Sequence, residues 1–291
     1  MQTIGFIGVG VMGRSMVKNL LKAGYDVAVY SRTRSKLTDF LAETGVRWCD
    51  TAADCAAGRD AVITMVGYPS DVEEVYLGEN GIFAAAANGT LLIDMTTSSP
   101  RLAKMLYAHG KARSLAVLDA PVTGGDSGAK AGTLTILVGG EKAAYERAYP
   151  LFQAMGTHIY YCGEAGRGQH MKLANQIMIA GTLSGVSEAI AYAKQQGMDP
   201  SMVISYLKDG AAGSRQLELL GPKMVAEDYA PGFFIKHFIK DMRLALEESQ
   251  KEHLRLQILE AVLSHFEELA QEGYDEMGTQ QLITFYLPPK K

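Results

Sequence analysis

The chain has 291 residues, 47% of them hydrophobic and 21% charged, which is enough for a sizeable core and predicts two domains. Its 28 basic and 32 acidic residues give a net charge of −4, and no basic stripe alternates with aromatic residues, so we expect no nucleic-acid partner. The three cysteines form no CxxC pair and no Cys/His cluster, so we expect no disulfide framework, no metal site and a cytoplasmic location.

No segment predicts insertion into a membrane. The N-terminus lacks a basic region, and glycines interrupt its apolar run. The apolar stretch over 177–193 follows Lys172 and contains Glu188, so we interpret it as a buried helix.

Residues 1–163 alternate strand-like and helix-like patterns. The apolar runs rich in Val, Ile and Leu predict strands over 3–8, 26–31, 60–66, 90–95, 115–121, 133–140 and 157–163. Helical patterns lie over 11–23, 34–44, 69–77, 99–112 and 141–153. This alternation predicts an α/β domain of Rossmann type, with a doubly wound, mostly parallel sheet covered on both faces.

Beyond residue 164 the pattern is helical only, over 167–196, 200–209, 215–227, 235–252 and 255–272. We therefore expect a dinucleotide-binding domain over 1–163 and an all-helical domain over 164–291, joined without a linker at "CGEAGRG". The long helix from 167 is apolar on nearly all sides, and Gly181 and Gly185 permit close helix packing. We expect it to carry the second domain and to contribute to a homodimer or homotetramer.

A glycine-rich loop follows the first predicted strand. The stretch "GFIGVGVMG" has the G-x-G-x-x-G spacing directly before a helix, which is typical of dinucleotide binding. The predicted cofactor-binding residues of this loop are Gly8, Gly10, Val11, Met12 and Gly13. A glycine-rich turn without a ligand is the alternative.

The end of the second predicted strand bears on the choice of cofactor. NAD sites commonly place Asp or Glu there, whereas this chain has Ser31, Arg32 and Thr33, with Arg34 nearby. A guanidinium group in place of a carboxylate suits the 2′-phosphate of NADP. We expect NADP to be preferred, with NAD as the other option; the alternative is a solvated basic helix start.

Two further segments carry candidate chemistry. Thr123, Gly124 and Gly125 follow the 115–121 strand, where adjacent glycines could direct backbone N–H groups at a small carboxylate or simply form a tight, hairpin-like connection. Lys172 and Asn175 are three residues apart and project from one face of the long helix. A buried lysine suits proton transfer, whereas a lysine whose head reaches solvent would have no catalytic role.

Taken together, five segments resemble the β-hydroxyacid dehydrogenases, which include 3-hydroxyisobutyrate dehydrogenases and semialdehyde reductases. They are "GFIGVGVMG", "DMTTSSP", "DAPVTGGDSGAKAGTL", "GRGQHMKLANQ" and "FIKHFIKDMRLA", in this order over essentially the whole chain. The resemblance implies a Rossmann-type domain, an all-helical domain and an active site in the cleft between them. It also implies hydride transfer between a nicotinamide and a small β-hydroxy acid or semialdehyde acid.

By motif, the resemblance assigns roles to individual residues. Lys172 falls on the catalytic lysine, Asn175 on the substrate-orienting asparagine, and Thr123 to Gly125 on the carboxylate-binding segment. Lys240 matches a residue that contacts both substrate and cofactor. The remaining matches are cofactor-binding: Met65, Val66, Thr97, Phe233 and Asp241.

The chain departs from the family pattern at two positions, since Thr123 stands where serine is common and Asp126 adds a negative charge beside the carboxylate site. Two other functions remain as alternatives. An imine reductase shares the two-domain plan, but Lys172 argues against it. A cofactor-binding scaffold without activity would be expected to have lost Lys172 or the two glycines, and both are present. A 6-phosphogluconate dehydrogenase would need a longer helical domain.

Overall fold

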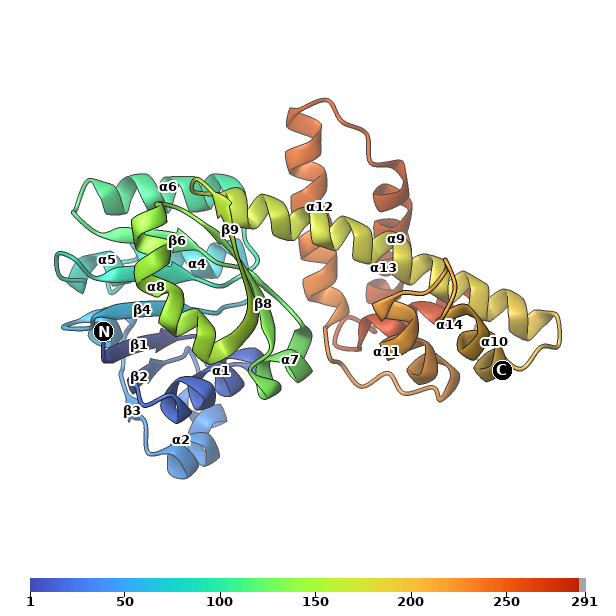
Figure 1. Ribbon diagram of the computed structural model, residues 1–291, viewed down its shortest axis with the longest axis horizontal. Helices are drawn as coiled ribbons and strands as arrows, with labels where there is room; N and C mark the ends of the chain where they lie inside the picture. Colours follow the sequence, from blue (N-terminus) through green and yellow to red (C-terminus); the bar gives the residue numbers. More distant parts are fainter. Residues whose placement is uncertain (288–291) are drawn as a thin grey trace. The chain divides into compact units, whose positions relative to one another are not determined.

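The computed structural model describes residues 1–287 and divides into two compact units (Figure 1). The first unit runs to Lys172 and the second begins at Leu173. The division falls in the second turn of the long helix α9 (Arg167–Gln195).

The first unit is built on a nine-stranded sheet with the order β3-β2-β1-β4-β5-β6-β8-β7, and β9 pairs with β8. The strands are β1 (Thr3–Ile7), β2 (Asp26–Tyr30), β3 (Arg47–Trp48), β4 (Ala61–Thr64), β5 (Leu91–Asp94), β6 (Ala116–Asp119), β7 (Val122–Thr123), β8 (Leu134–Gly139) and β9 (Gly156–Gly163). The strands from β3 to β6 are parallel, whereas β8 runs antiparallel to β6 and β7. This arrangement confirms the predicted doubly wound, mostly parallel sheet.

Helices cover both faces of this sheet because alternate strand residues point to opposite sides. Phe6 belongs to the same buried cluster as Met16 and Phe152, whereas its neighbour Ile7 packs in a second cluster with Tyr76. The first face carries α1 (Val11–Lys22), α2 (Thr38–Thr44), α7 (Gly125–Ala131) and α8 (Lys142–Met155). The second carries α3 (Ala52–Ala56), α4 (Pro69–Leu77), α5 (Ile82–Ala85) and α6 (Pro100–Lys111).

The hairpin-like connection considered for 119–140 is wrong, because the helix α7 lies between β7 and β8. Its sequence "GDSGAKA" is short and contains two glycines, so local propensity gives no helical signal. Tertiary contacts stabilise it instead: Ala129 is fully buried, and the Asn19 side chain of α1 donates to the Ala129 carbonyl at 2.7 Å. The short elements β3, β7, α3 and α5 also escaped prediction.

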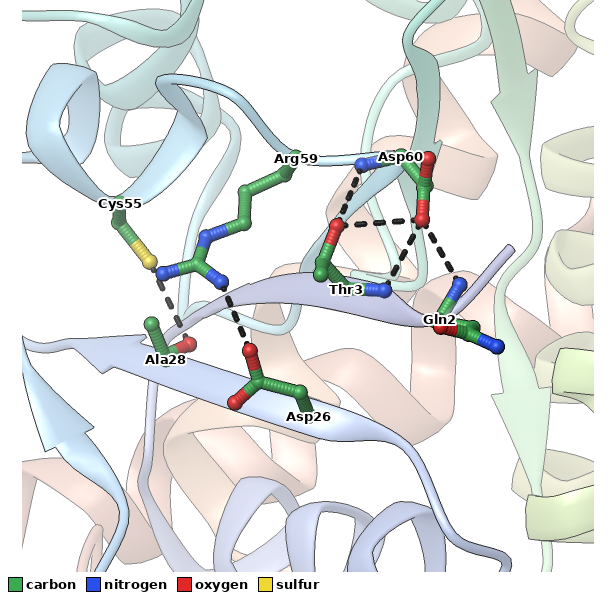
Figure 2. A network of polar contacts seen from close by, with 7 residues as sticks. All are labelled: Gln2, Thr3, Asp26, Ala28, Cys55, Arg59 and Asp60. Carbon is green, nitrogen blue, oxygen red and sulfur yellow. Dashed lines mark hydrogen bonds and ion pairs between the residues drawn. The ribbon is translucent and has the colours of Figure 1, made fainter.

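Polar contacts join the strands at the edge where β1, β2 and β4 begin (Figure 2). One oxygen of Asp60 accepts the backbone N–H groups of Gln2 at 2.7 Å and Thr3 at 3.0 Å. These two bonds lower the pKa of the Asp60 carboxyl to about 2. Beside them, Arg59 reaches Asp26 at 3.5 Å. These contacts fix the alignment of the strands at the edge opposite to their carboxyl ends.

The first turn of α9 is attached to the sheet by Asp119, the last residue of β6. Its two carboxylate oxygens accept the N–H groups of Gly166 at 2.7 Å and Gln169 at 2.9 Å. Asp119 thus caps a helix that begins 48 residues later in the sequence. Its carboxyl is buried, and burial raises its pKa from 3.8 to about 6 although both hydrogen bonds act in the opposite direction.

Over residues 173–287 the second unit is helical, as predicted, and contains one isolated β-bridge between Phe234 and Gly278. After α9 it comprises α10 (Pro200–Leu207), α11 (Arg215–Val225), α12 (Ile235–Lys251), α13 (Gln257–Gln271), the 3-10 turn η2 (Thr279–Leu282) and α14 (Ile283–Tyr286). Phe238 and Phe266 meet edge to face at 5.2 Å in its core. Within residues 1–287 no helix combines the length and apolar character required to span a bilayer.

Replacing Asp119 with asparagine should change how stability depends on pH. Because the folded pKa is about 6 and the ordinary value 3.8, the wild-type fold binds the proton more tightly than the unfolded chain. Wild-type stability should therefore fall, relative to Asp119→Asn, as the pH rises from about 4 to about 6, by up to about 3 kcal/mol. Urea unfolding followed by the single tryptophan, Trp48, measures this difference. Parallel pH profiles for the two proteins would contradict the assignment.

Candidate functional site

The register of the parallel strands brings the loops of the first unit together. Ile7 pairs with Tyr30 on one side and Thr64 on the other, Thr64 pairs with Asp94, and Asp94 pairs with Asp119. The loops that follow these five residues therefore leave the same edge of the sheet. In open parallel sheets, ligands bind at this carboxyl edge. Thr123 ends the short strand β7, and every other site residue predicted before residue 126 lies in one of these loops or at the start of α1 or α7.

The glycine loop has the geometry that dinucleotide binding requires. Gly8 has φ +98°, and a Cβ at this position would lie 2.2 Å from the Met65 carbonyl oxygen. A Cβ on Gly13 would lie 2.1 Å from the Gly8 carbonyl oxygen. At Gly10, by contrast, a Cβ would have no protein atom within 4 Å. Gly8 and Gly13 are thus required by packing, whereas the space at Gly10 suits the close approach of a pyrophosphate.

The start of α1 complements this space. Gly10 is the N-cap, no side chain caps the helix, and its first turn contains no acidic residue. The N–H groups of a helix N-terminus and the helix dipole both favour an anion. The residues present at this helix start therefore fit a dinucleotide cofactor.

A cavity of about 760 Å³ adjoins the glycine loop and the end of β2. Five of the predicted cofactor-binding residues line it: Gly10, Val11, Ser31, Arg32 and Thr33. It also contains four further basic side chains and three acidic ones, namely Arg14, Lys18, Lys36, Lys130, Asp39, Glu43 and Asp126. With Arg32, basic groups outnumber acidic groups by five to three, so the cavity favours an anionic ligand.

The two arginines after β2 have different surroundings. The side chain of Arg32 is 80% exposed, lines the cavity and forms an ion pair with Asp71 at 3.3 Å. The guanidinium group of Arg34 lies over the ring of Trp48 at 5.6 Å and does not line the cavity. Arg32 is therefore the better placed of the two to meet a ligand, and Lys36 is a further cation that the sequence did not single out.

The loop after β6 carries the predicted carboxylate-binding segment. Gly124 has φ +129° and Gly125 has φ +62°, so both positions use backbone conformations that favour glycine. Thr123, at the end of β7, is half-buried. Asp126, which introduced a negative charge beside this segment, pairs with Lys130 at 2.6 Å, so its charge is offset within α7.

The other predicted residues of the first unit lie in the loops after β4 and β5. Met65 and Val66 are half-buried, and the Val66 N–H donates to the Thr96 hydroxyl at 3.0 Å. Thr97 is half-buried in the same segment as Thr96. The loops of these two strands are thus joined directly at the carboxyl edge of the sheet.

Lys172 lies in the second turn of α9 and is buried, with 6% of its surface exposed. Gln169, one turn earlier and fully buried, holds this part of the helix to the loop after β5. Its side-chain oxygen accepts the Ser98 N–H at 2.9 Å, and its side-chain nitrogen donates to the Thr96 carbonyl at 2.8 Å. With the Asp119 cap, these bonds fix the helix turn that carries the lysine.

In the second unit, Asn175 belongs to a chain of polar contacts. It donates to Gln176 at 2.8 Å, and Gln176 donates to Asp241 at 2.7 Å. Asp241 also pairs with Lys240 at 3.0 Å, and both side chains are largely buried, so this is not an ordinary surface ion pair. Phe233, just before α12, packs edge to face against Phe238 at 5.6 Å.

Three buried polar residues that organise these groups were missed by the sequence analysis: Asp119, Gln169 and Gln176. All three stand inside motifs that the analysis quoted, Asp119 in "DAPVTGGDSGAKAGTL" and the two glutamines in "GRGQHMKLANQ". A carboxylate ending an apolar strand was the signal available for Asp119. Nothing in the local sequence indicated the partners of the two glutamines.

Two family models match the two parts of the chain. The model of the NAD binding domain of 6-phosphogluconate dehydrogenase matches residues 3–163. The model of the NAD-binding domain of NADP-dependent 3-hydroxyisobutyrate dehydrogenase matches residues 166–286. Together the two models cover nearly the whole chain.

Individual relatives match over nearly their full length. An uncharacterised oxidoreductase of Bacillus subtilis, YkwC, is 49% identical over 98% of this chain and 99% of its own. The NAD-dependent L-serine dehydrogenase of Pseudomonas aeruginosa is 37% identical over 95% of each chain. The structure of Mycobacterium tuberculosis 3-hydroxyisobutyrate dehydrogenase with L-serine has a TM-score of 0.88 at 28% identity, covering 97% of this chain and 98% of that one.

Imine reductases are more distant. The enzyme of Myxococcus stipitatus has a TM-score of 0.65 at 19% identity, covering 99% of each chain. At this identity the likeness shows the fold alone. The comparisons therefore favour a hydroxyacid dehydrogenase over the imine reductase considered as an alternative.

Alanine at Gly13 should destabilise the fold, whereas alanine at Gly10 should weaken cofactor binding. Gly13→Ala places its methyl group against the Gly8 carbonyl, so the thermal midpoint should fall steeply, whereas Gly10→Ala should cost no more than about 1 kcal/mol. Gly10→Ala should instead weaken cofactor binding at least tenfold (about 1.4 kcal/mol), because its methyl group occupies the space of the pyrophosphate. Thermal unfolding and titration with NADPH measure the two effects. Unchanged NADPH affinity in Gly10→Ala would show that the cofactor does not bind at this loop.

Proposed function

Because the chain belongs to the β-hydroxyacid dehydrogenase family and is an NAD(P)-dependent oxidoreductase, we propose that it interconverts a short β-hydroxy acid and its semialdehyde, with Lys172 as general acid and base. The observation that carries this proposal is the burial of Lys172, 6% exposed, on a helix turn fixed by Gln169 and Asp119. A buried, oriented ammonium group is suited to donate a proton rather than to solubilise a surface.

In reduction, the bound cofactor supplies a hydride to the carbonyl carbon of the substrate. Lys172 donates its proton to the carbonyl oxygen as negative charge develops there, and in oxidation the neutral amine accepts the proton of the alcohol. Positioned acid–base catalysis of this kind contributes about 10²–10⁴-fold to the rate. Asn175, on the same face of α9, orients the reacting groups.

The substrate carboxylate is assigned to Thr123, Gly124 and Gly125. Two features support this assignment: the positive φ angles of Gly124 and Gly125, which leave backbone without side chains at this point of the loop, and the Thr123 hydroxyl, a hydrogen-bond donor. Lys130 offsets the charge of Asp126, so this acidic residue does not oppose an anionic substrate. Lys240, which pairs with Asp241, is assigned to the substrate or the cofactor by its match to the family motif.

Lys172→Ala should lower kcat by about 10²–10⁴-fold, because the general acid is lost. The dissociation constant for NADPH should change by less than about twofold, since the lysine acts on the substrate oxygen. Lys194→Ala, on an exposed position of the same helix, is the matched control and should retain wild-type activity. The assay follows nicotinamide absorbance with a panel of short semialdehydes and β-hydroxy acids, L-serine among them. Lys172→Ala with most of the wild-type activity would refute the mechanism, and no turnover of any panel member would refute the substrate class.

We further propose that NADP is preferred over NAD. The end of β2 has no carboxylate for a ribose hydroxyl, and Arg32 and Lys36 line the adjoining cavity. A 2′-phosphate carries more charge than the single carboxylate of Asp71, with which Arg32 pairs. The NAD-dependent relative from Pseudomonas aeruginosa makes this preference a property of the individual chain rather than of the family.

Arg32→Ala should reduce the ratio of kcat/KM for NADPH to that for NADH by roughly tenfold or more, as expected for one charge-assisted hydrogen bond. The kcat/KM for NADPH should fall, and the kcat/KM for NADH should stay unchanged. Arg34→Ala is the control, because Arg34 stacks on Trp48 outside the cavity and its loss should leave the ratio unchanged. Equal use of NADH and NADPH by the wild-type protein would overturn the preference.

The exposed face of α9 supports a homodimer or homotetramer. Met178 is 73% exposed and Tyr192 is 65% exposed, and a Cβ on the intervening Gly185 would have no protein atom within 4 Å. Exposed apolar groups beside a small residue suit close packing against a second copy. A monomer in sedimentation velocity would contradict this.

A cytoplasmic location, proposed on cysteine usage, would be contradicted by recovery outside the cytoplasmic fraction.

A further inference from the structure

The chain of hydrogen bonds in the second unit has a direction. Gln176 and Asp241 are both 1% exposed, and a carboxylate can only accept hydrogen bonds. Gln176 must therefore turn its amide nitrogen to Asp241, where the distance to Oδ2 is 2.7 Å. Its amide oxygen then faces away from Asp241 and accepts from the Asn175 amide nitrogen at 2.8 Å.

The same logic fixes the amide of Asn175. Because its nitrogen is directed to Gln176, its oxygen is the group that it can offer on the side of Lys172, three residues earlier on α9. An amine has N–H groups to donate whether it is protonated or neutral. An acceptor oxygen can therefore orient Lys172 before and after proton transfer, whereas an amide NH₂ group in this place would repel the ammonium form.

We infer that Gln176 is a positioning residue. Because Asp241 can only accept hydrogen bonds, Gln176 presents its amide oxygen to Asn175, and Asn175 in turn presents its own oxygen to the amine of Lys172. This inference rests on the proposed role of Lys172 as acid and base. Gln176 itself touches neither substrate nor cofactor in this scheme. Asp241 supplies the fixed end of the chain and pairs with Lys240 at 3.0 Å.

Gln176→Glu tests the direction of the chain. A protonated glutamic acid can donate its O–H to Asp241 and accept from Asn175 with its carbonyl oxygen. It therefore keeps both hydrogen bonds that the glutamine side chain makes. An ionised glutamate has no donor and stands beside a second carboxylate. Titration of this group will respond to Asp241, Lys240 and His237 on α12 and to Lys172 on its own helix. Wherever these groups set its pKa, the active form is the protonated one.

The measurement is kcat of Gln176→Glu divided by kcat of the wild type, between about pH 8 and about pH 5.5, with NADPH and the semialdehyde turned over best. The ratio should rise toward one as the pH falls through the pKa of the introduced carboxyl, by up to about tenfold per pH unit, since only the protonated form keeps both hydrogen bonds. The KM for NADPH should stay within about twofold. Gln195→Glu, an exposed glutamine on the same helix, should give a ratio independent of pH.

A ratio for Gln176→Glu that is flat and well below one, or that rises with pH, would overturn the inference. If this variant does not fold, Gln176→Met carries the test: it keeps the shape without the hydrogen bonds and should lose about tenfold in kcat at every pH, whereas kcat within twofold of wild type would overturn the inference. The proposed function fails separately. Activity retained in Lys172→Ala refutes the catalytic lysine, whereas an inactive Lys172→Ala with a flat Gln176→Glu ratio well below one refutes the positioning role alone.

Discussion

The attachment of α9 to the sheet by Asp119 is the interaction on which the candidate site depends. It ties the last residue of a core strand to the first turn of the helix that carries Lys172, through hydrogen bonds to Gly166 and Gln169. Space for this contact exists only because Gly139 and Gly168 lack side chains: a Cβ on either would lie within 3 Å of the Asp119 carboxylate. The raised pKa of Asp119 shows that burying the charge is costly. The hydrogen bonds from Gly166 and Gln169 offset part of this cost.

The register of the sheet is the second constraint. Asp60 and Arg59 join the strands at one edge, and the in-register ends at Ile7, Thr64 and Asp94 set the loops at the other. A shift by one residue would exchange the two faces of a strand and would separate Gly8 from Met65. The glycine loop is therefore specified by the core packing below it as well as by its own sequence.

The sequence predicted those features whose signal is local. Alternating apolar runs and helical patterns predicted the strands β1, β2, β4, β5, β6 and β8 and the longer helices on both faces, because burial on two sides leaves a clear hydrophobic pattern. The glycine loop was predictable because its spacing reflects backbone geometry. The helix α7 was not, since Ala129 and the bond from Asn19 stabilise it through contacts 110 residues apart. Gln176 was missed for the same reason, as its partner Asp241 lies 65 residues further along the chain.

The two glutamines of α9 illustrate how buried amides can organise a charged group. Gln169, Lys172 and Gln176 are spaced by three and four residues, so they lie on one face of the helix. Each glutamine has its orientation decided by partners that cannot reverse their roles: a backbone N–H and a carbonyl for Gln169, a carboxylate for Gln176. A buried amide with both ends satisfied resists rotation, because a flip would leave two polar groups unpaired. Under the proposed mechanism, the amides on either side of Lys172 are neutral and do not titrate, so they keep their orientation while the lysine gains and loses its proton.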